Sequence, residues 1–325
     1  MFNVKLTTPF PDLPLLRQTP GGEGRWGEFR FFLNQEISEC DYWVVLDGLS
    51  ETEATKCPRE NTVLVTLEPP SIKMYDEKFL NQFSGVITCH DGIKHPNVLL
   101  TQQAMPWHIG MSVKNGRCLS FNKGYDQLKT ITAFKKDRLI SVISSGKKYT
   151  EGHKKRVAFA EKLKNHFGSG IDVFGRDKKE IEDKWDGISR YRYHIALENS
   201  SCKDYWTEKL SDAFLGGAYP FYYGCPNIGD YFPEGSLTEI DIEDFDKSVL
   251  IIEEAIESKL YERSVGKICK ARDLVLDKYN IFPMICEKLD KMGAHADKRI
   301  VRLEPERDFT ESIVKKTMRK IMPGQ

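Results

Sequence analysis

The sequence predicts an α/β protein built from two Rossmann-like domains. Short apolar runs of the buried-strand type alternate with amphipathic helical segments, an order typical of parallel sheets covered by helices. This alternation weakens over residues 113–136 and then begins again, which predicts a linker between two α/β series. A chain of 325 residues is long enough for two domains of ordinary size.

Composition narrows the class of protein and of partner. Hydrophobic residues make up 40% of the chain and aromatic residues 11%, which is enough apolar mass for a sizeable core. Lys and Arg together number 48, as do Asp and Glu, so the net charge is zero, which argues against a nucleic-acid partner. The eight cysteines form no C-x-x-C pair, so we expect reduced thiols, with no disulfide frame and no metal site.

No segment of the sequence has the pattern of a membrane span or a signal peptide. The first ten residues, MFNVKLTTPF, lack a basic stretch followed by an apolar one. No run of about 18 apolar residues occurs. We therefore expect a cytoplasmic protein, with peripheral attachment to the inner face of the membrane as the alternative.

The first series is expected to form a domain over residues 1–136. A Pro- and Gly-rich loop should follow its first strand, up to Gly24. The expected strands are Val4–Thr7, Tyr42–Leu46, Thr62–Leu67 and Gly85–Thr88, and the expected helices are Glu28–Asn34 and Ile72–Phe83.

The second series is expected to form a domain over residues 137–304. The expected strands are Leu139–Ser144, Ile171–Phe174, Tyr193–Leu197 and Tyr219–Tyr223, and the expected helices are Glu151–His166, Leu210–Leu215 and a long one from about Lys247. Residues 305–325 read as a basic helix that either packs across the domains or lies on an anionic membrane surface. A cleft between two such domains is where ligands usually bind.

One motif in the first series matches a dinucleotide-binding pattern but lacks the structural context that this pattern needs. Gly22–Gly27 fits the pattern G-x-G-x-x-G, but a dinucleotide fingerprint directly follows a strand. Here the motif follows a Pro-rich loop, so we interpret it as a flexible loop.

Polar residues gather where the strand Tyr193–Leu197 ends. Glu198 and Asn199 follow this strand, and Asp204 is the expected N-cap of the next helix. Glu208 and Lys209 then lie in the first turns of that helix. Because a helix N-terminus offers free N–H groups and positive potential, this arrangement suits a phosphate.

The same segment carries a family resemblance. The run ENSSCKDYWTEKL, followed by GGAYPFYYGCPNIGDYFPEGS, resembles the donor-binding motif of the family 10 α-1,3/1,4-fucosyltransferases, over roughly residues 139–246. The resemblance implies a GT-B type α/β fold, in which two Rossmann-like domains face each other across a cleft. It also implies GDP-fucose as the donor substrate, with no metal and no permanently bound cofactor. Because the sequence shows no membrane anchor, unlike the animal members, it looks like the bacterial members of the family.

The resemblance assigns roles to several residues of the second series. Lys209 would face the diphosphate, and Glu208 the hydroxyls of the ribose or the fucose. Arg176, in the run IDVFGRDK, stands where the family keeps an arginine for the diphosphate. Asn199, Tyr205 and Ser144 complete the expected donor site.

The resemblance is weaker in the first series. Glu68 ends the run TVLVTLE, where the family has a glutamate that serves as the general base, and Pro69 and Pro70 would stiffen its turn. The acceptor, an oligosaccharide or a lipid-linked glycan, is expected near Arg25, Trp26 and His90.

The expected reaction is an inverting transfer of L-fucose from GDP-fucose to a glycan hydroxyl, giving an α-1,3-type linkage. Two alternatives stay open. One is a GT-B transferase that uses another nucleotide-deoxysugar. The other is a non-catalytic sugar-binding protein on the same fold.

Overall fold

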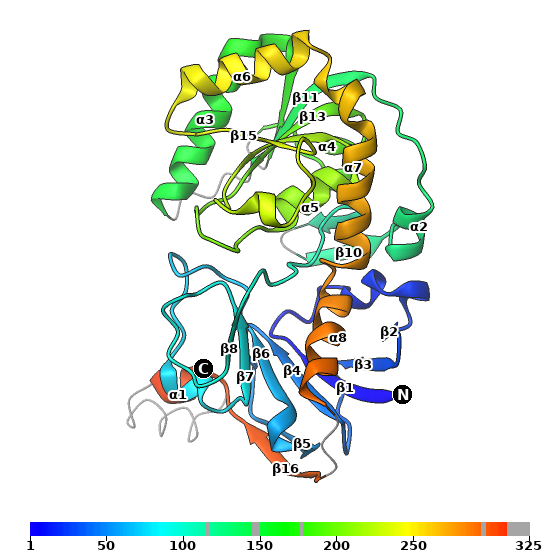
Figure 1. Cartoon of the computed structure of the whole chain (residues 1–325), viewed down its shortest axis with the longest axis vertical. Helices are drawn as coiled ribbons and strands as arrows, with labels where there is room; N and C mark the ends of the chain where they lie inside the picture. Colours follow the sequence, from blue (N-terminus) through cyan, green and yellow to red (C-terminus); the bar gives the residue numbers. More distant parts are fainter. Residues whose placement is uncertain (115–116, 145–149, 176–177, 294–296, 311–325) are drawn as a thin grey trace. The chain divides into compact units, whose positions relative to one another are not determined.

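The structure is a computed structural model that describes residues 1–114, 117–144, 150–175, 178–293 and 297–310. The chain divides into two compact units, neither of which is one continuous stretch (Figure 1). Unit 1 holds residues 1–11, 24–103 and 285–325, and unit 2 holds residues 12–23 and 104–284. These boundaries differ from the expected 1–136 and 137–304, because the expected linker belongs to unit 2 and the end of the chain belongs to unit 1.

Unit 1 is built on a seven-stranded sheet in the order β2-β3-β1-β4-β6-β7-β8. All neighbouring strands are parallel except β2 and β3. The strands are β1 (Phe2–Thr7), β2 (Arg25–Trp26), β3 (Phe29–Leu33), β4 (Tyr42–Leu46), β6 (Thr62–Val65), β7 (Gly85–Thr88) and β8 (Val98–Leu100).

Two of the helices expected in the first series are corrected. Residues 29–33 form strand β3, because the bulky residues alternate: Phe29 and Phe31 are buried while Arg30 is exposed, which is the period of a strand. The helix expected at Ile72–Phe83 is only α1 (Glu77–Leu80), which begins at the cap Asp76.

A second small sheet completes unit 1. Strand β5 (Glu53–Cys57) pairs with β16 (Arg299–Leu303), so a segment late in the chain packs on an early one. Val301 and Leu303 of β16 join Trp43, Leu64 and Phe79 in one hydrophobic core. The turn η3 (Arg59–Asn61), α9 (Arg307–Thr310) and helix α8 (Ile281–Met292) from residue 285 onward also belong to unit 1. The remainder of the expected C-terminal helix lies outside the described residues.

Unit 2 is built on a five-stranded parallel sheet in the order β12-β11-β13-β14-β15. The strands are β11 (Arg138–Ile143), β12 (Ile171–Phe174), β13 (Tyr191–Leu197), β14 (Tyr219–Tyr223) and β15 (Thr238–Glu239). All the strands expected in the second series are therefore confirmed within two residues.

Helices cover this sheet. Helix α3 packs against β12, α4 against β11, and α5 against β13 and β14, while α7 packs on α5. The helices are α2 (Tyr125–Lys129), α3 (Glu151–Phe167), α4 (Lys184–Ile188), α5 (Glu208–Leu215), α6 (Phe245–Glu257) and α7 (Leu260–Asp277), with short 3-10 turns η1 (Leu15–Gln18), η2 (Pro20–Gly22), η4 (Gly168–Gly170) and η5 (Ile228–Asp230). The expected linker contains α2, strand β10 (Arg117–Phe121) and the last two residues of β9 (Met111–Lys114), which pairs antiparallel with β10.

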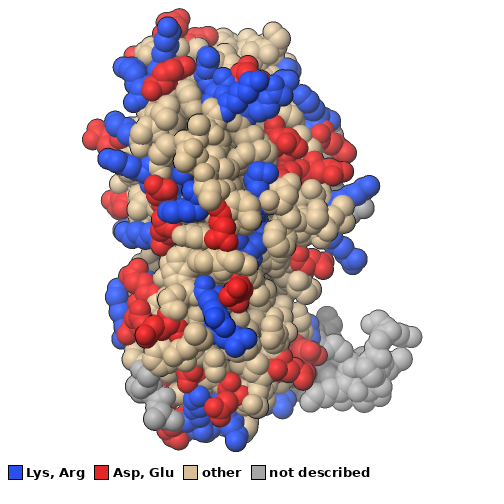
Figure 2. Space-filling view, turned by 90° about the vertical axis from the view of Figure 1, so that its right-hand side faces the viewer, with Lys and Arg blue, Asp and Glu red and all other residues tan. Residues whose placement is uncertain are grey.

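Charge is spread over the surface. In the view of Figure 2, basic and acidic side chains are interspersed over the described part of that face. Among the described helices, none combines the length and the apolarity that a membrane span needs. The Gly22–Gly27 stretch, interpreted as a flexible loop, instead contains strand β2, and β3 follows it, so the stretch is not the strand-to-helix turn that a dinucleotide fingerprint forms.

Candidate functional site

The polar residues expected at the donor site lie at the carboxyl edge of the unit 2 sheet. Ser144 follows β11, and Glu198 and Asn199 follow β13, which pairs directly with β11. After β11 the chain adds β12 on one side, and it then returns to add β13 on the other. Ligands of open α/β sheets bind at this kind of switch point, outside the carboxyl ends of the strands.

Glu198 anchors the start of helix α5. Its side chain is fully buried, and it accepts hydrogen bonds from the backbone N–H and the hydroxyl of Thr207, each at 2.8 Å. Thr207 is the N-cap of α5 and accepts from the N–H of Lys209. The expected cap, Asp204, instead accepts hydrogen bonds from Asn227 and Tyr231 and has a positive φ of 60°. The helix therefore begins three residues later than a cap at Asp204 would place it.

Two glycines allow this edge to pack closely. A Cβ on Gly224 would lie 2.5 Å from Cγ of Glu198, so a larger residue there would push the carboxylate from its place. A Cβ on Gly152, in the first turn of α3, would lie 2.0 Å from the carbonyl oxygen of Asn199. The first turn of α3 thus lies directly against the end of β13.

Acidic and basic side chains form one network at the start of α5. The carboxylate of Glu208 lies 3.4 Å from the ammonium groups of both Lys184 and Lys209, and 3.9 Å from Nδ1 of His108. Burial alone would raise the pKa of Glu208, but Lys209, Lys184 and His108 together lower that pKa well below its usual value. Glu208 is therefore ionised at neutral pH.

Lys184 and Asp212 extend the network and were not predicted from the sequence. The ammonium of Lys184 lies 2.8 Å from Oδ2 of Asp212, whose side chain is almost completely buried. Oδ1 of Asp212 accepts the backbone N–H groups of His108 and Ile109, each at 3.0 Å. The sequence offers little indication of this ion pair, because Lys184 lies 28 residues from Asp212.

The other residues expected at the donor site differ from one another in their surroundings. Tyr205 is buried and lies two residues before Thr207, the cap of α5. The hydroxyl of Ser144 and Oδ1 of Asn199 are buried, and neither has a hydrogen-bond partner within the described residues. Arg176 lies outside the described residues. In the same described ranges, no group of three or more His, Cys, Asp or Glu side chains could hold a metal ion.

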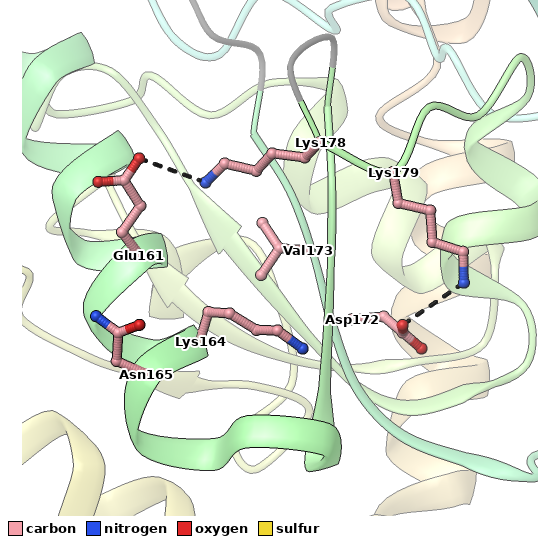
Figure 3. Close-up of a pocket in the computed structure, with 7 residues that line it drawn as sticks. All are labelled: Glu161, Lys164, Asn165, Asp172, Val173, Lys178 and Lys179. Atoms are coloured by element: carbon pink, nitrogen blue, oxygen red, sulfur yellow. Dashed lines mark ion pairs between the residues drawn. The ribbon is translucent and has the colours of Figure 1, made fainter.

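A separate hollow of about 470 Å³ lies between α3 and β12, and Figure 3 shows the residues that line it. Its lysines are already paired: Lys178 lies 3.7 Å from Glu161, and Lys179 lies 3.6 Å from Asp172. Lys164 donates hydrogen bonds to the carbonyl groups of Gly168 and Ile171. This hollow is lined by none of the residues expected at the donor site.

Glu68 lies beyond the carboxyl end of β6 in unit 1, on a well-anchored turn. Nε2 of His90 lies 2.6 Å from the carbonyl oxygen of Glu68, so the neutral ring donates this hydrogen bond. Burial lowers the pKa of His90, which favours the neutral ring. The backbone N–H of Leu67 donates a hydrogen bond to Oδ1 of Asp47, and the same oxygen accepts a hydrogen bond from the hydroxyl of Tyr75.

The structure separates the three residues expected to bind the acceptor. His90 is buried and holds the Glu68 turn. Trp26 pairs with Phe29 at the amino end of β3, so Arg25 and Trp26 lie at the opposite edge of the sheet from Glu68. Unit 1 therefore does not bring Arg25 and Trp26 together with Glu68.

Comparisons with known proteins point to one family. Residues 133–255 match the family described as glycosyltransferase family 10 (fucosyltransferase), C-terminal part. An α-(1,3)-fucosyltransferase 4 from Mus musculus is 36% identical over 96 residues, which are 27% of this chain and 22% of the relative. A GDP-fucose protein O-fucosyltransferase 3 from Xenopus laevis is 44% identical over 46 residues, 14% of this chain and 10% of the relative. The chain thus spans less than a quarter of the length of each of these relatives.

A solved structure shows the fold. An α-glucosyltransferase (AGT) in complex with UDP superimposes with a TM-score of 0.54, at 11% identity, over 90% of this chain and all of that one. This likeness, with the two parallel sheets, confirms an α/β fold of the GT-B type with two Rossmann-like units. The matched segment 133–255 contains Lys184, Glu198, Glu208, Lys209 and Asp212 of the network, and over this segment the chain is similar to glycosyltransferase family 10, the fucosyltransferase family.

Proposed function

We propose that this chain is a glycosyltransferase that moves L-fucose from GDP-fucose to a hydroxyl group of a glycan acceptor. The carrying observation is the network at the start of α5, where Lys209 and Glu208 lie within the family-matched segment at the carboxyl edge of the sheet. The names of two relatives, an α-(1,3)-fucosyltransferase and a GDP-fucose-dependent transferase, support the choice of donor.

The donor half of the proposed mechanism rests on charge. The diphosphate would meet the N–H groups at the start of α5 and the ammonium group of Lys209, with Arg176 as a further proposed contact. Lys209 is held in place by Glu198 at 3.1 Å and by the hydroxyl of Thr207 at 3.0 Å. A cation that is fixed beforehand stabilises the charge that develops on the departing diphosphate without the cost of reorganisation. Asn199, Tyr205 and Ser144 would shape the remainder of the donor pocket.

In the acceptor half, Glu68 is the proposed general base. It would take the proton from the acceptor hydroxyl while that oxygen attacks the anomeric carbon in a single displacement, which inverts the configuration. The anchored turn supports this role, because a base must be held within hydrogen-bond reach of the proton it removes. The proposed acceptor is an oligosaccharide or a lipid-linked glycan, joined through an α-1,3-type linkage.

The donor is tested by thermal shift with GDP, UDP, dTDP and CMP. We expect stabilisation by GDP alone. Stabilisation by another nucleotide without any from GDP would replace GDP-fucose with a different nucleotide-deoxysugar.

Catalysis is tested by transfer of labelled fucose to a glycan library. Glu68→Gln should abolish most of the transfer, whereas Glu77→Gln, an exposed glutamate on α1, should leave it unchanged. Full activity of Glu68→Gln would remove Glu68 from the role of base. GDP binding with neither transfer nor donor hydrolysis would instead favour a sugar-binding protein.

A further inference from the structure

A large polar hollow lies at the carboxyl edge of the unit 1 sheet, away from Arg25 and Trp26. Its volume is about 870 Å³, and it is lined by residues that follow β1, β3 and β4. These residues are Thr8, Pro11, Asn34–Ser38 and Ser50–Thr52, and the lining is completed by Glu53 and Ala54 of β5 and by Lys5 of β1 at the base.

The topology of the sheet places this hollow at its switch point. After β1 the chain adds β3 on one side of β1, and it then returns to add β4 on the other. The loops that follow these strands therefore diverge and leave a crevice, as they do at the switch point of unit 2. The same edge carries Glu68, which follows β6, the neighbour of β4.

The base of the hollow is fixed and its one cation is neutralised. The buried ammonium of Lys5 lies 2.9 Å from Oε2 of Glu53 and donates a hydrogen bond to the carbonyl group of Gln35. The hydroxyl of Thr7 also bonds to Glu53. Lys5 therefore offers no uncompensated positive charge to an anionic ligand.

The walls combine hydrogen-bond donors with acceptors. Oδ1 of Asn34 accepts the N–H of Thr8 at 2.8 Å, which holds the amide so that its NH₂ group can serve a ligand. Glu36 and Glu51 are exposed, and within the described residues neither forms an ion pair. Amides, hydroxyls and carboxylates together suit the hydroxyl groups of a sugar, which both donate and accept, whereas an ammonium ligand could only donate.

We infer that this hollow is the acceptor subsite and that it binds a neutral oligosaccharide. The inference rests on the proposed transferase function and names its acceptor class. Acidic glycans should be rejected, because Glu36 and Glu51 repel carboxylates and phosphates. Neighbouring strands lie about 4.8 Å apart, so the ends of β1 and β6 are separated by roughly 10 Å, and a bound oligosaccharide can reach from the hollow toward Glu68.

The test is binding of the labelled full chain, with GDP present, to an array of neutral and acidic oligosaccharides. Two variants perturb the hollow: Ala54→Trp fills it from an exposed position on β5, and Glu36→Lys reverses a wall charge. Glu28→Lys, an exposed change at the amino end of β3, is the matched control. Trp26→Ala tests the opposite edge of the sheet.

The wild type should bind neutral glycans in preference to acidic ones. Ala54→Trp and Glu36→Lys should weaken this binding about tenfold or more, and the control should not. The inference is overturned if the wild type binds no neutral glycan, if both variants of the hollow bind normally, or if only Trp26→Ala loses binding. The GDP-induced thermal shift and the hydrolysis of GDP-fucose are measured in every variant. If the wild type shows the GDP-induced shift and hydrolyses GDP-fucose but the glycan-binding results contradict the inference, only the acceptor subsite is overturned. If the wild type shows neither the shift nor the hydrolysis, the proposed transferase function itself has failed.

Discussion

The ammonium group of Lys209 lies 3.1 Å from a carboxylate oxygen of Glu198, a residue with no exposed surface. This pair joins the end of strand β13 to the first turn of helix α5. The same carboxylate holds the cap of that helix through Thr207. One buried acid therefore positions both the lysine and the helix start that we propose for the diphosphate.

Glu198→Ala should destabilise unit 2 strongly. The change removes the acceptor for Thr207 and the buried partner of Lys209, and breaking such a buried pair costs about 3–5 kcal/mol. Urea denaturation would measure the loss in the free energy of unfolding. The exposed Glu254→Ala, on α6, should change it by less than about 0.5 kcal/mol. Equal stability of both variants would contradict the anchoring role of Glu198.

Lys209→Met should lower kcat for fucose transfer by about 10²–10³-fold, because the leaving diphosphate loses a fixed positive charge. The melting temperature would be measured in parallel to separate this loss from unfolding. Lys247→Met, an exposed lysine on α6, is the control and should keep full activity. A kcat within twofold of the wild type would exclude Lys209 from the diphosphate site.

The ion pairs of Glu208 predict how stability depends on pH. Its folded-state pKa is lowered, so as the pH falls the unfolded chain, with a pKa near 4.3, takes up the proton first. The contribution of ionised Glu208 is therefore complete above about pH 4.3 and is lost as the pH drops toward the folded-state pKa. Glu208→Gln should flatten the acid limb of the stability curve by up to about 1.4 kcal/mol per pH unit. Urea titrations from pH 3 to 7 test this, and parallel curves for both proteins would refute it.

His90→Phe should lower kcat about tenfold and leave KM for the donor unchanged. Phe keeps the packing against Tyr75 but cannot donate to the carbonyl of Glu68, a loss on the order of 1–3 kcal/mol. His90→Gln, which retains an N–H donor, should recover part of the activity. Because burial lowers the pKa of His90, its titration should leave no step in the activity profile above about pH 6.5. An unchanged kcat in His90→Phe would show that this contact does not position Glu68.

Local patterns predicted the sheets well. Runs such as Tyr42–Leu46 and Ile171–Phe174 are continuous and apolar, as strands buried on both faces must be. The stretch Phe29–Leu33 was misread as a helix because it is short and its alternation spans only five residues. Its pairing with β1, which no local signal reveals, decides its conformation.

For a similar reason, only some residues of the candidate site could be predicted from the sequence. Glu208 and Lys209 lie beside a recognisable helix start, so the sequence pointed to them. Lys184 looked like an ordinary surface lysine, since its partner Asp212 comes close only after α4 and α5 have packed. Trp26 beside Arg25 looked suited to a sugar, but the register of β2 with β3 places both at the other edge.

The pairing of β16 with β5 has a consequence for synthesis on the ribosome. Residues 299–303 complete a sheet whose other strand, residues 53–57, leaves the exit tunnel more than 240 residues earlier. At about 5–20 residues per second, that interval lasts on the order of 10–50 seconds. During this time Thr55 and Cys57, which are buried in the finished protein, lack the strand that pairs with them. Unit 2, which spans no residue beyond 284, can finish folding before unit 1 although unit 1 begins the chain.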